Sequence, residues 1–345
     1  MKLSDFDYQL PKELIAQFPP AERHSSRMML VYREKGEIVD SSFIHLPSFL
    51  RPGDLLVVNN TQVIPARLFA QHSKRGRRIE ILLARQLQDS CWEALIKGSR
   101  YVRKGDTLLI QGDELKATVL EEKDEGKRVL QFQHKGDFLT LINNIGKVPL
   151  PPYIKREEIK SLDRQRYQTL FASQPGSVAA PTGGLHFSPQ IIDKLKKADI
   201  KLVEITLHIG PGTFRPIRTE QVEQHNMEEE YYQISQSSAK KIAAAQAEGR
   251  RIVAVGTSTV RALESWAMKG IEEPSHLNGW TDLFIYPVFH FRLLRGLLTN
   301  FHLPKSTLLL LVAAFAGMDL ILKAYQRAVE EGYRFYSYGD CMLIF

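Results

Sequence analysis

The chain has few of the residues and patterns that mark several large classes of protein. Cys91 and Cys341 are the only cysteines among 345 residues, and neither lies in a metal-type or redox-type pair. The longest apolar run, residues 308–316, is less than half of the roughly 20 residues that a membrane span needs. The N-terminal residues MKLSDFDYQL contain no apolar signal-peptide core. We therefore expect a cytoplasmic protein without disulfides and without a membrane span.

Familiar nucleotide and catalytic fingerprints are also missing. Residues 305–307 (KST) end like a P-loop, but Pro304 precedes them and the required Gly-x-x-x-x-Gly is absent. The segment 210–212 (GPG) is too short a glycine motif for a dinucleotide or methyltransferase fingerprint. No Gly-x-Ser-x-Gly elbow is present. The segment 225–230 (HNMEEE) places a histidine near carboxylates without His-Glu-x-x-His spacing, so we expect no metal site.

Positive charge is concentrated in one part of the chain. The net charge is +7, and residues 65–155 hold 17 Lys and Arg against 11 Asp and Glu. Two basic groups stand out there: Lys74, Arg75, Arg77 and Arg78, and then Arg100, Arg103 and Lys104. They are either an ordinary solvated surface or a patch for the phosphate backbone of a nucleic acid, which binds through such local charge.

The same segment has the pattern of a small β-barrel. Short, partly alternating stretches recur at roughly ten-residue spacing between Gly- and Asp-bearing turns. The predicted strands are 78–84, 91–97, 107–110, 114–121 and 128–134. Residues 148–153 (VPLPPY) form a stiff extended connector at its end. The sequence thus predicts a basic, antiparallel barrel domain inserted at 65–155.

On either side of the insertion, short apolar strands alternate with helical patterns. The predicted strands are 54–59, 201–208, 251–255, 283–286, 297–300 and 333–338, and the predicted helices are 189–198, 235–248, 257–268, 306–316 and 319–331. Such alternation is typical of an α/β protein. We expect a mostly parallel sheet or an irregular barrel, built discontinuously from residues 1–64 and 156–345.

Three segments in this α/β part carry the strongest functional signal. In 176–187 (GSVAAPTGGLHF), 207–214 (LHIGPGTF) and 299–307 (TNFHLPKST), an apolar run gives way to Gly, Pro, Thr and one histidine. This pattern predicts His186, His208 and His302 at strand ends, the edge on which α/β folds carry their chemistry. Loops 255–259 and 304–307 lead into helix N-termini, which hold an anion or serve as ordinary caps. The sequence therefore indicates an enzyme.

Nearly the whole chain resembles one enzyme family. The resemblance lies in long strings in the same order, among them DFDYQLPKELIAQFPPAERHSSRMMLV (5–31), DLLVVNNTQVIPARL (54–68), VPLPPYIKR (148–156), RYQTLFA (166–172), GSVAAPTGGLHF (176–187), TLHIGPGTFRP (206–216), AVGTSTVRALES (254–265), TNFHLPKSTLLLLVAAFAG (299–317) and YRFYSYGDCMLI (333–344). They are similar to the S-adenosylmethionine:tRNA ribosyltransferase-isomerases of queuosine biosynthesis, whose fold is an α/β domain interrupted by a small β-barrel.

The resemblance implies a reaction and its substrates. Such enzymes transfer the ribosyl group of S-adenosylmethionine to 7-aminomethyl-7-deazaguanine at the wobble position of tRNA with a GUN anticodon. The ribose isomerises to an epoxycyclopentanediol, giving epoxyqueuosine, and adenine and methionine are released. S-adenosylmethionine is then a consumed substrate, and no cofactor is expected. The basic residues of the insertion become tRNA-binding candidates, and we expect a monomer.

The chemistry requires a base for the ribose 5′ C–H next to the sulfonium, and an acid for the departing adenine. Histidines and carboxylates with tuned pKa values suit these tasks. The catalytic candidates are His186, His208, His302, Glu230 and Asp340, with His186 or His302 favoured as the base. The substrate-binding candidates are Arg27, Thr182, Gly210, Thr213, Arg215, Thr257, Ser258, Arg261, Asn300, Lys305 and Ser306. The three arginines among them are clamps for a carboxylate or phosphate, or else structural ion pairs.

The chain departs from the family's pattern at three positions. Gly183 replaces the usual Ala of APTAGLHF, and Glu228 replaces the second His of a His-x-Met-His-x-Glu motif. A carboxylate there has a pKa about two units lower than a histidine. Arg295 replaces an Asp before the LLTNFHLP run, which we expect to reverse a charge near the site. Two alternatives stay open: a metal-dependent hydrolase on an α/β barrel, and a catalytically weakened tRNA-binding protein.

Overall fold

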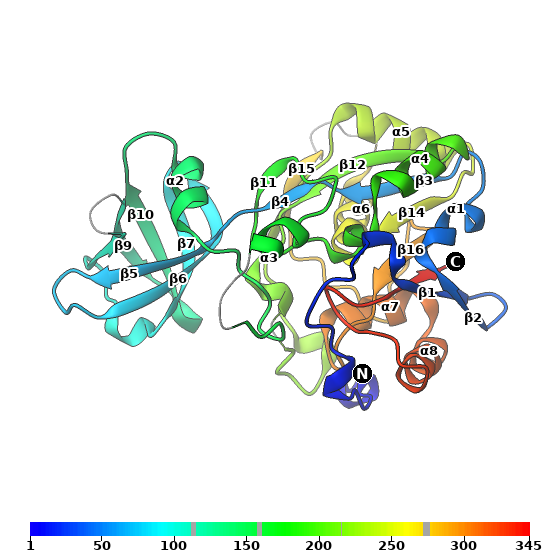
Figure 1. Cartoon of the computed structure of the whole chain (residues 1–345), viewed down its shortest axis with the longest axis horizontal. Coiled ribbons are helices and arrows are strands. Elements are labelled where there is room, and N and C mark those ends of the chain that lie inside the picture. Colours follow the sequence, from blue (N-terminus) through cyan, green and yellow to red (C-terminus); the bar gives the residue numbers. More distant parts are fainter. Residues whose placement is uncertain (112–114, 157–160, 215, 272–276) are drawn as a thin grey trace.

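The computed structural model describes residues 1–111, 115–156, 161–214, 216–271 and 277–345 and shows an open sheet body joined to a closed barrel (Figure 1). The sheet has the spatial order β15 (Asn278–Thr281), β13 (Glu230–Gln233), β12 (Lys201–Leu207), β3 (Leu55–Asn59), β14 (Ile252–Val255), β16 (Gly296–Asn300), β17 (Cys341–Ile344), β1 (Arg27–Tyr32) and β2 (Glu37–Ser42). A small parallel pair, β4 (Thr61–Val63) and β11 (Gln174–Ser177), lies beside it.

The centre of the sheet is parallel and fully buried. Strands β12, β3, β14 and β16 run in the same direction, and every residue of β3, β14 and β16 is buried. Continuous apolar runs are typical of strands that are covered on both faces. The antiparallel pairs lie at β15–β13–β12, at β16–β17 and at β1–β2. The prediction of an α/β fold is confirmed, and of its two forms the sheet is found rather than the irregular barrel.

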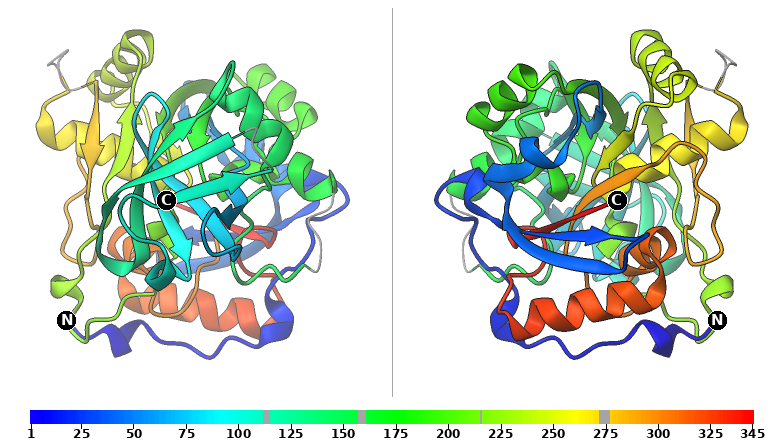
Figure 2. Two further views of the ribbon diagram at one scale, coloured as in Figure 1. Left: turned by 90° about the vertical axis from the view of Figure 1, so that its left-hand side faces the viewer. Right: turned by 90° about the vertical axis from the view of Figure 1, so that its right-hand side faces the viewer.

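Helices cover both faces of the sheet and enclose two apolar cores. One core packs α5 (Gln236–Ala247), α6 (Thr257–Lys269), α7 (Thr307–Ala316) and α8 (Met318–Glu330) against the sheet, and the other packs α1 (Leu46–Phe49) and α4 (Pro189–Lys197) against it. The blue N-terminal segment runs along the red-orange α8 (Figure 2), where Tyr8 and Tyr325 pack with their ring centroids 5.1 Å apart.

The inserted barrel is confirmed and has six antiparallel strands. They are β10 (Lys127–Gln133), β7 (Cys91–Lys97), β6 (Arg78–Gln88), β5 (Arg67–His72), β8 (Thr107–Ile110) and β9 (Leu115–Glu122). Helix α2 (Phe138–Ile145) closes the barrel core by packing Phe138 on Trp92, with their ring centroids 5.9 Å apart. Neither β5 nor α2 is among the predicted elements. Glu114, the first residue of one predicted strand, lies outside the described residues.

Two predicted strands are wrong. Residues 283–286 are buried or half-buried against the core of the sheet body but pair with no strand, and the strand lies earlier, at β15. Residues 333–338 bury their aromatic side chains in a turn in which Tyr336 has a φ of +72°, and the strand follows at β17. In both places, apolar residues serve side-chain packing rather than a strand ladder, a difference that composition does not reveal.

The two chain segments that join the bodies pack tightly at Gly146. This residue ends α2, and a Cβ atom built on it would lie 2.0 Å from the carbonyl oxygen of Pro65. The next residue, Lys147, forms a bridge with Arg67 at the start of β5. The outgoing and returning chains therefore touch through backbone atoms, which leaves no room for a side chain.

We predict that Gly146→Ala destabilises the protein by about 3 kcal/mol, because the backbone of Pro65 cannot yield to the added methyl group as a flexible side chain would. Gly136→Ala is the matched control: nothing lies within 4 Å of its Cβ, and only its φ of +77° opposes the change, at about 1–2 kcal/mol. Urea unfolding followed by circular dichroism measures both. Equal losses would contradict the close approach at Gly146.

Candidate active site

A cavity of about 580 Å³ opens where the parallel strands end. Ile209 and Gly256, which follow β12 and β14, line it together with Asn300, the last residue of β16. In open α/β sheets, ligands bind outside the carboxyl ends of the strands, and pockets of roughly 300–1,000 Å³ hold small molecules. The size and place of this cavity are those of a substrate site.

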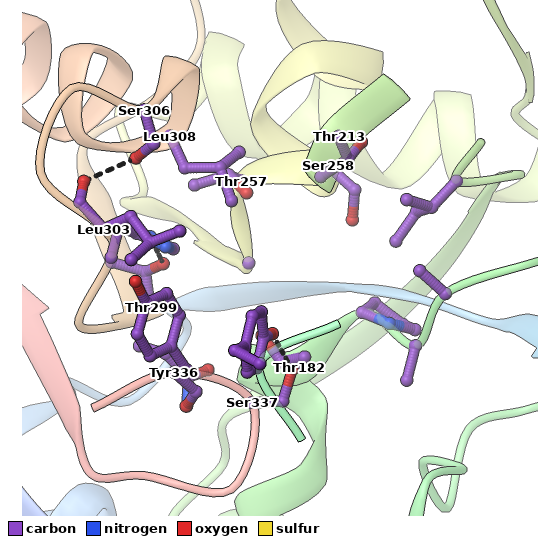
Figure 3. A pocket seen from close by; sticks show the side chains of 18 of the residues that line it. Thr182, Thr213, Thr257, Ser258, Thr299, Leu303, Ser306, Leu308, Tyr336 and Ser337 are labelled. Carbon is purple, nitrogen blue, oxygen red and sulfur yellow. Dashed lines mark hydrogen bonds between the residues drawn. The ribbon is translucent and has the colours of Figure 1, made fainter. Parts of the chain in front are cut away.

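Ten of the predicted site residues line this cavity. They are Thr182, Thr213, Glu230, Thr257, Ser258, Arg261, Asn300, His302, Lys305 and Ser306. Figure 3 shows Thr257, Ser258 and Ser306 on one side, facing Tyr336 and Ser337 on the other. The structure thus brings together residues that lie up to 124 positions apart, from Thr182 to Ser306.

A buried ion pair forms one wall of the cavity. The Glu230 carboxylate accepts a hydrogen bond from the Arg261 guanidinium, and both side chains are only 4% exposed. Its other oxygen accepts from the amide of Gly210 at 2.9 Å and from the hydroxyl of Thr213 at 3.0 Å. Arg261 also donates to the carbonyl oxygens of Thr281 and Leu283. Because the side chains of Glu230 and Arg261 are both hydrogen-bonded to the surrounding protein, the pair holds the wall in place.

His302 is the predicted catalytic histidine that reaches the cavity. Its Nε2 lies 2.9 Å from the hydroxyl of Thr299, and its amide donates to the hydroxyl of Tyr325. Burial lowers the pKa of His302 from 6.5 to about 3, so the imidazole is neutral at physiological pH. In the tautomer in which Nε2–H donates to Thr299, Nδ1 carries the lone pair, and this ring can accept a proton.

The N-termini of α6 and α7 meet at the cavity. Thr257 and Ser258 open α6, and Ser306 caps α7 by accepting a hydrogen bond from the amide of Leu309 at 3.2 Å. Helix N-termini carry partial positive charge and free N–H groups, which favour anions. The nearby Lys305 amine pairs with Asp7 at 2.5 Å. This part of the cavity therefore suits a carboxylate or another anionic group.

His186 lies behind the cavity wall rather than in it. It closes a short 3-10 helix, Thr182–His186, instead of following a strand directly. Its Nδ1 lies 2.9 Å from the Ser26 hydroxyl, and its Nε2 accepts from the side-chain amide of Asn300 at 3.2 Å. Burial lowers the pKa of His186 from 6.5 to about 4. Both ring nitrogens thus have protein partners, and the ring holds the amide of Asn300.

His208 also lies outside the cavity lining. It directly follows β12, as predicted, but its Nδ1 lies 2.8 Å from the Thr61 hydroxyl and its ring packs beneath Gly176. A Cβ atom on Gly176 would come within 2.9 Å of the imidazole. Burial lowers the pKa of His208 from 6.5 to about 4. Its contacts join β12 to the β4–β11 pair.

Three further predicted residues, Asp340, Arg27 and Gly210, are not among the lining residues. The Asp340 carboxylate accepts hydrogen bonds from the backbone amides of Arg27 and Arg334, at 2.9 and 2.8 Å. It therefore holds these two backbone segments together. The Arg27 guanidinium lies 3.7 Å over the ring of Tyr333, at the surface. Gly210 contributes its amide to Glu230 from behind the wall. Arg215 lies outside the described residues.

Two tyrosines that are not among the predicted site residues form the opposite wall. Tyr153, from the connector, and Tyr336 stack with ring centroids 4.3 Å apart, and both line the cavity. The Tyr153 hydroxyl shares a 2.6 Å hydrogen bond with the hydroxyl of Ser337. The positive φ of Tyr336 is unusual for a bulky residue, and strain of this kind gathers at functional sites. Both residues lie in the matching strings 148–156 and 333–344, the one signal that could have found them.

The two basic groups of the barrel meet at one end of it. Strand β5 leads away from the connection to the sheet body, and the loop after it carries Lys74, Arg75 and Arg77 to the far end (Figure 1). The guanidiniums of Arg77 and Arg100 lie 3.7 and 4.7 Å over the ring of Tyr101. All seven predicted residues, Lys74, Arg75, Arg77, Arg78, Arg100, Arg103 and Lys104, are exposed. Arg103 pairs with Glu122 at 3.0 Å.

Comparisons with known proteins agree with this architecture. The family model described as "Queuosine biosynthesis protein" matches residues 3–344. The S-adenosylmethionine:tRNA ribosyltransferase-isomerases of Halothermothrix orenii and Carboxydothermus hydrogenoformans are 48% and 50% identical to this chain, over 100% of each chain. The crystal structure of S-adenosylmethionine tRNA ribosyltransferase from Thermotoga maritima has 39% identity and a TM-score of 0.56, covering 99% of this chain and 100% of its own.

The chain belongs to the queuosine biosynthesis protein family. The resemblance noted from the sequence strings is confirmed. Two departures from the family's pattern have a clear structural setting. A Cβ on Gly183 would lie 3.0 Å from the amide nitrogen of Gly256, so an alanine here would press on the N-terminus of α6. Arg295 precedes β16, whereas Asn300 ends it at the cavity, so the expected charge reversal near the site is wrong.

Nowhere in 1–111, 115–156, 161–214, 216–271 or 277–345 do three His, Cys, Asp or Glu side chains gather as metal ligands. In the same ranges, no single helix is long and apolar enough to cross a membrane. The pair α7 and α8, bent by 118°, meets the length and composition criteria only together.

We predict that buried histidines make stability depend on pH. His208 has a pKa of about 4 in the folded protein and about 6.5 when unfolded. Between these values, the unfolded chain binds a proton that the folded protein excludes, so the free energy of unfolding falls as the pH falls. At pH 5, this loss is about 2 kcal/mol for one such histidine.

His208→Gln removes this contribution, so its free energy of unfolding should change less between pH 7 and pH 5, by about 2 kcal/mol, than that of the original protein. Chemical unfolding at the two pH values measures the difference. His290→Gln, at an exposed position, is the control and should keep the original pH dependence. The same dependence in the His208 variant would contradict the buried, neutral state of the ring.

Proposed function

We propose that this protein is an S-adenosylmethionine:tRNA ribosyltransferase-isomerase. It transfers and isomerises the ribosyl group of S-adenosylmethionine onto 7-aminomethyl-7-deazaguanine at the tRNA wobble position, which gives epoxyqueuosine, adenine and methionine. The observation that carries this proposal is the end-to-end identity of 46–50% with enzymes of that name, over all of this chain. The cavity at the carboxyl edge of the parallel strands provides the place for the reaction.

His302 is the residue we assign to removal of the ribose 5′ proton. The sulfonium acidifies that C–H bond, and a neutral imidazole in the cavity can take the proton to leave an ylide. The buried His302 ring is neutral, and Thr299, with its hydroxyl 2.9 Å from Nε2, orients it. His186 is less suited because Asn300 already donates to its Nε2. We therefore assign His186, His208 and Asp340 to positioning.

The lining suggests how S-adenosylmethionine lies in the cavity. Its methionine carboxylate fits the N-termini of α6 and α7, where Thr257, Ser258 and Ser306 provide N–H groups and hydroxyls. Its adenine fits the stacked wall of Tyr153 and Tyr336, because aromatic rings favour offset stacking. The ribose then lies between these two ends, near His302 and Glu230.

The barrel supplies the tRNA contacts in this proposal. Its seven exposed basic residues form a local positive surface, which suits phosphates, and Tyr101 between Arg77 and Arg100 offers a ring face to an unstacked base. The tRNA would span from this end of the barrel to the cavity, so both bodies act on one substrate. We further propose that the enzyme works as a monomer in the cytoplasm.

The deciding experiment measures adenine release from S-adenosylmethionine with and without tRNA that carries 7-aminomethyl-7-deazaguanine at the wobble position. We expect release only with the modified tRNA, and a matching mass gain of that nucleoside by mass spectrometry. Unmodified tRNA is the control substrate. Tight tRNA binding without adenine release would overturn the proposal and favour a protein that only binds tRNA.

The same assay tests the role of His302. His302→Gln should lower kcat by about 10²–10⁴-fold, the usual contribution of a general base, with little change in the KM for tRNA. His290→Gln, exposed and outside the cavity lining, should match the original protein. Full activity of the His302 variant would remove it from this role and make Glu230 the next candidate.

For the barrel, we predict that the double variant Arg77→Ala, Arg100→Ala weakens tRNA binding and reduces its salt dependence. Two lost phosphate contacts should flatten the slope of log K against log salt by about 2. S-adenosylmethionine affinity should not change. Lys135→Ala is the control because the course of β10 places it at the opposite end of the barrel from these loops. An unchanged slope in the double variant would place the tRNA elsewhere.

A further inference from the structure

Two acidic residues directly before Glu230 reach across to the barrel. The Glu228 carboxylate lies 3.0 Å from the Lys127 amine, at the start of β10, and the Glu229 carboxylate lies 3.0 Å from the Arg85 guanidinium, on β6. Lys127 and Glu228 are 19% and 27% exposed, so water screens this pair less than a pair at the open surface. The two ion pairs join the barrel to the strand that carries Glu230.

The barrel residues in these pairs are held from more than one side. Arg85 stacks 3.6 Å over the ring of Trp280, on β15, next to its ion pair with Glu229. Lys127 also lies 3.5 Å from Glu93 of the neighbouring strand β7. One side of the barrel therefore docks on the edge of the sheet formed by β13 and β15, separately from the two connecting chains.

Glu228 also touches the loop that holds Glu230. A Cβ atom on Gly212 would lie 2.8 Å from the Glu228 carboxylate, so the loop backbone packs against this side chain. The same loop donates to Glu230 through the amide of Gly210 and the hydroxyl of Thr213. A continuous series of contacts thus runs from Lys127 through Glu228 and the 210–213 loop to the Glu230–Arg261 pair in the cavity wall.

We propose that Glu228 is a positioning residue through which the barrel, by way of Lys127, sets the 210–213 loop and Glu230 for catalysis. The proposal rests on the proposed function. It means that tRNA held by the barrel favours the arrangement of the cavity in which adenine is released. It also gives Glu228, a departure from the family's pattern, a role as the partner of a barrel lysine rather than as a substitute base.

A charge-reversal cycle tests this inference. Lys127→Glu and Glu228→Lys each place like charges together across the interface, and the double variant restores an ion pair with the charges exchanged. We expect each single variant to lower kcat for adenine release at saturating tRNA by about 10-fold, and the double variant to return to within about 3-fold of the original, a coupling of ordinary size between sites. The KM for S-adenosylmethionine should change less than kcat, because these substitutions leave the N-termini of α6 and α7 untouched.

Lys135→Glu is the matched control. Lys135 is exposed and lies two residues after β10, so its reversal changes the charge of the barrel equally but leaves the pairs of Lys127 with Glu93 and Glu228 in place. Its kcat should stay within about 2-fold of the original. The inference is overturned if Lys135→Glu lowers kcat as much as Lys127→Glu does, or if the double variant shows no recovery.

Hydrogen exchange of the 210–213 backbone gives a second readout that needs no turnover. Exchange should rise in both single variants and fall again in the double variant, because the Gly210 amide loses and regains its hydrogen bond with Glu230. If the original protein releases no adenine, the proposed function fails, and this measurement still decides the inference. Unchanged exchange in all three variants would overturn it.

Discussion

The buried ion pair between Glu230 and Arg261 is the constraint on which the site depends. It joins β13 to α6, and through further hydrogen bonds it holds the 210–213 loop and the carbonyls of Thr281 and Leu283. Removing one partner of such a pair costs about 3–5 kcal/mol, because the other charge stays buried. One interaction therefore fixes the positions of four segments around the cavity.

Burial decides the state of the three histidines at this edge of the sheet. His186, His208 and His302 all have lowered pKa values, because a charged imidazole would lose its hydration inside the protein. They differ in what surrounds them. His302 lines the cavity, whereas His186 holds Asn300 and His208 joins two strands. The same residue type thus lines the cavity in one place and holds neighbouring protein groups in the others.

Much of the fold could be predicted from local patterns, and the failures have a common cause. The buried runs at β3, β14 and β16 and the alternating strands of the barrel were found because period and apolar content define them. The segments 283–286 and 333–338 are also apolar but form no extended strand. The first packs its side chains on the core, and the second makes a single bridge, between Phe335 and Ile15. Pairing depends on distant parts of the chain, which a local pattern does not contain.

By itself, the sequence determined the family, the α/β class with its inserted barrel, the basic character of that barrel and ten of the residues that line the cavity. These properties are carried by long motifs and by residue type. Only the tertiary structure decided which histidine reaches the cavity, that Tyr153 and Tyr336 form its wall, and that Glu228 meets Lys127. Each of these depends on contacts between residues at least a hundred positions apart or on burial, and both arise only when the chain is packed.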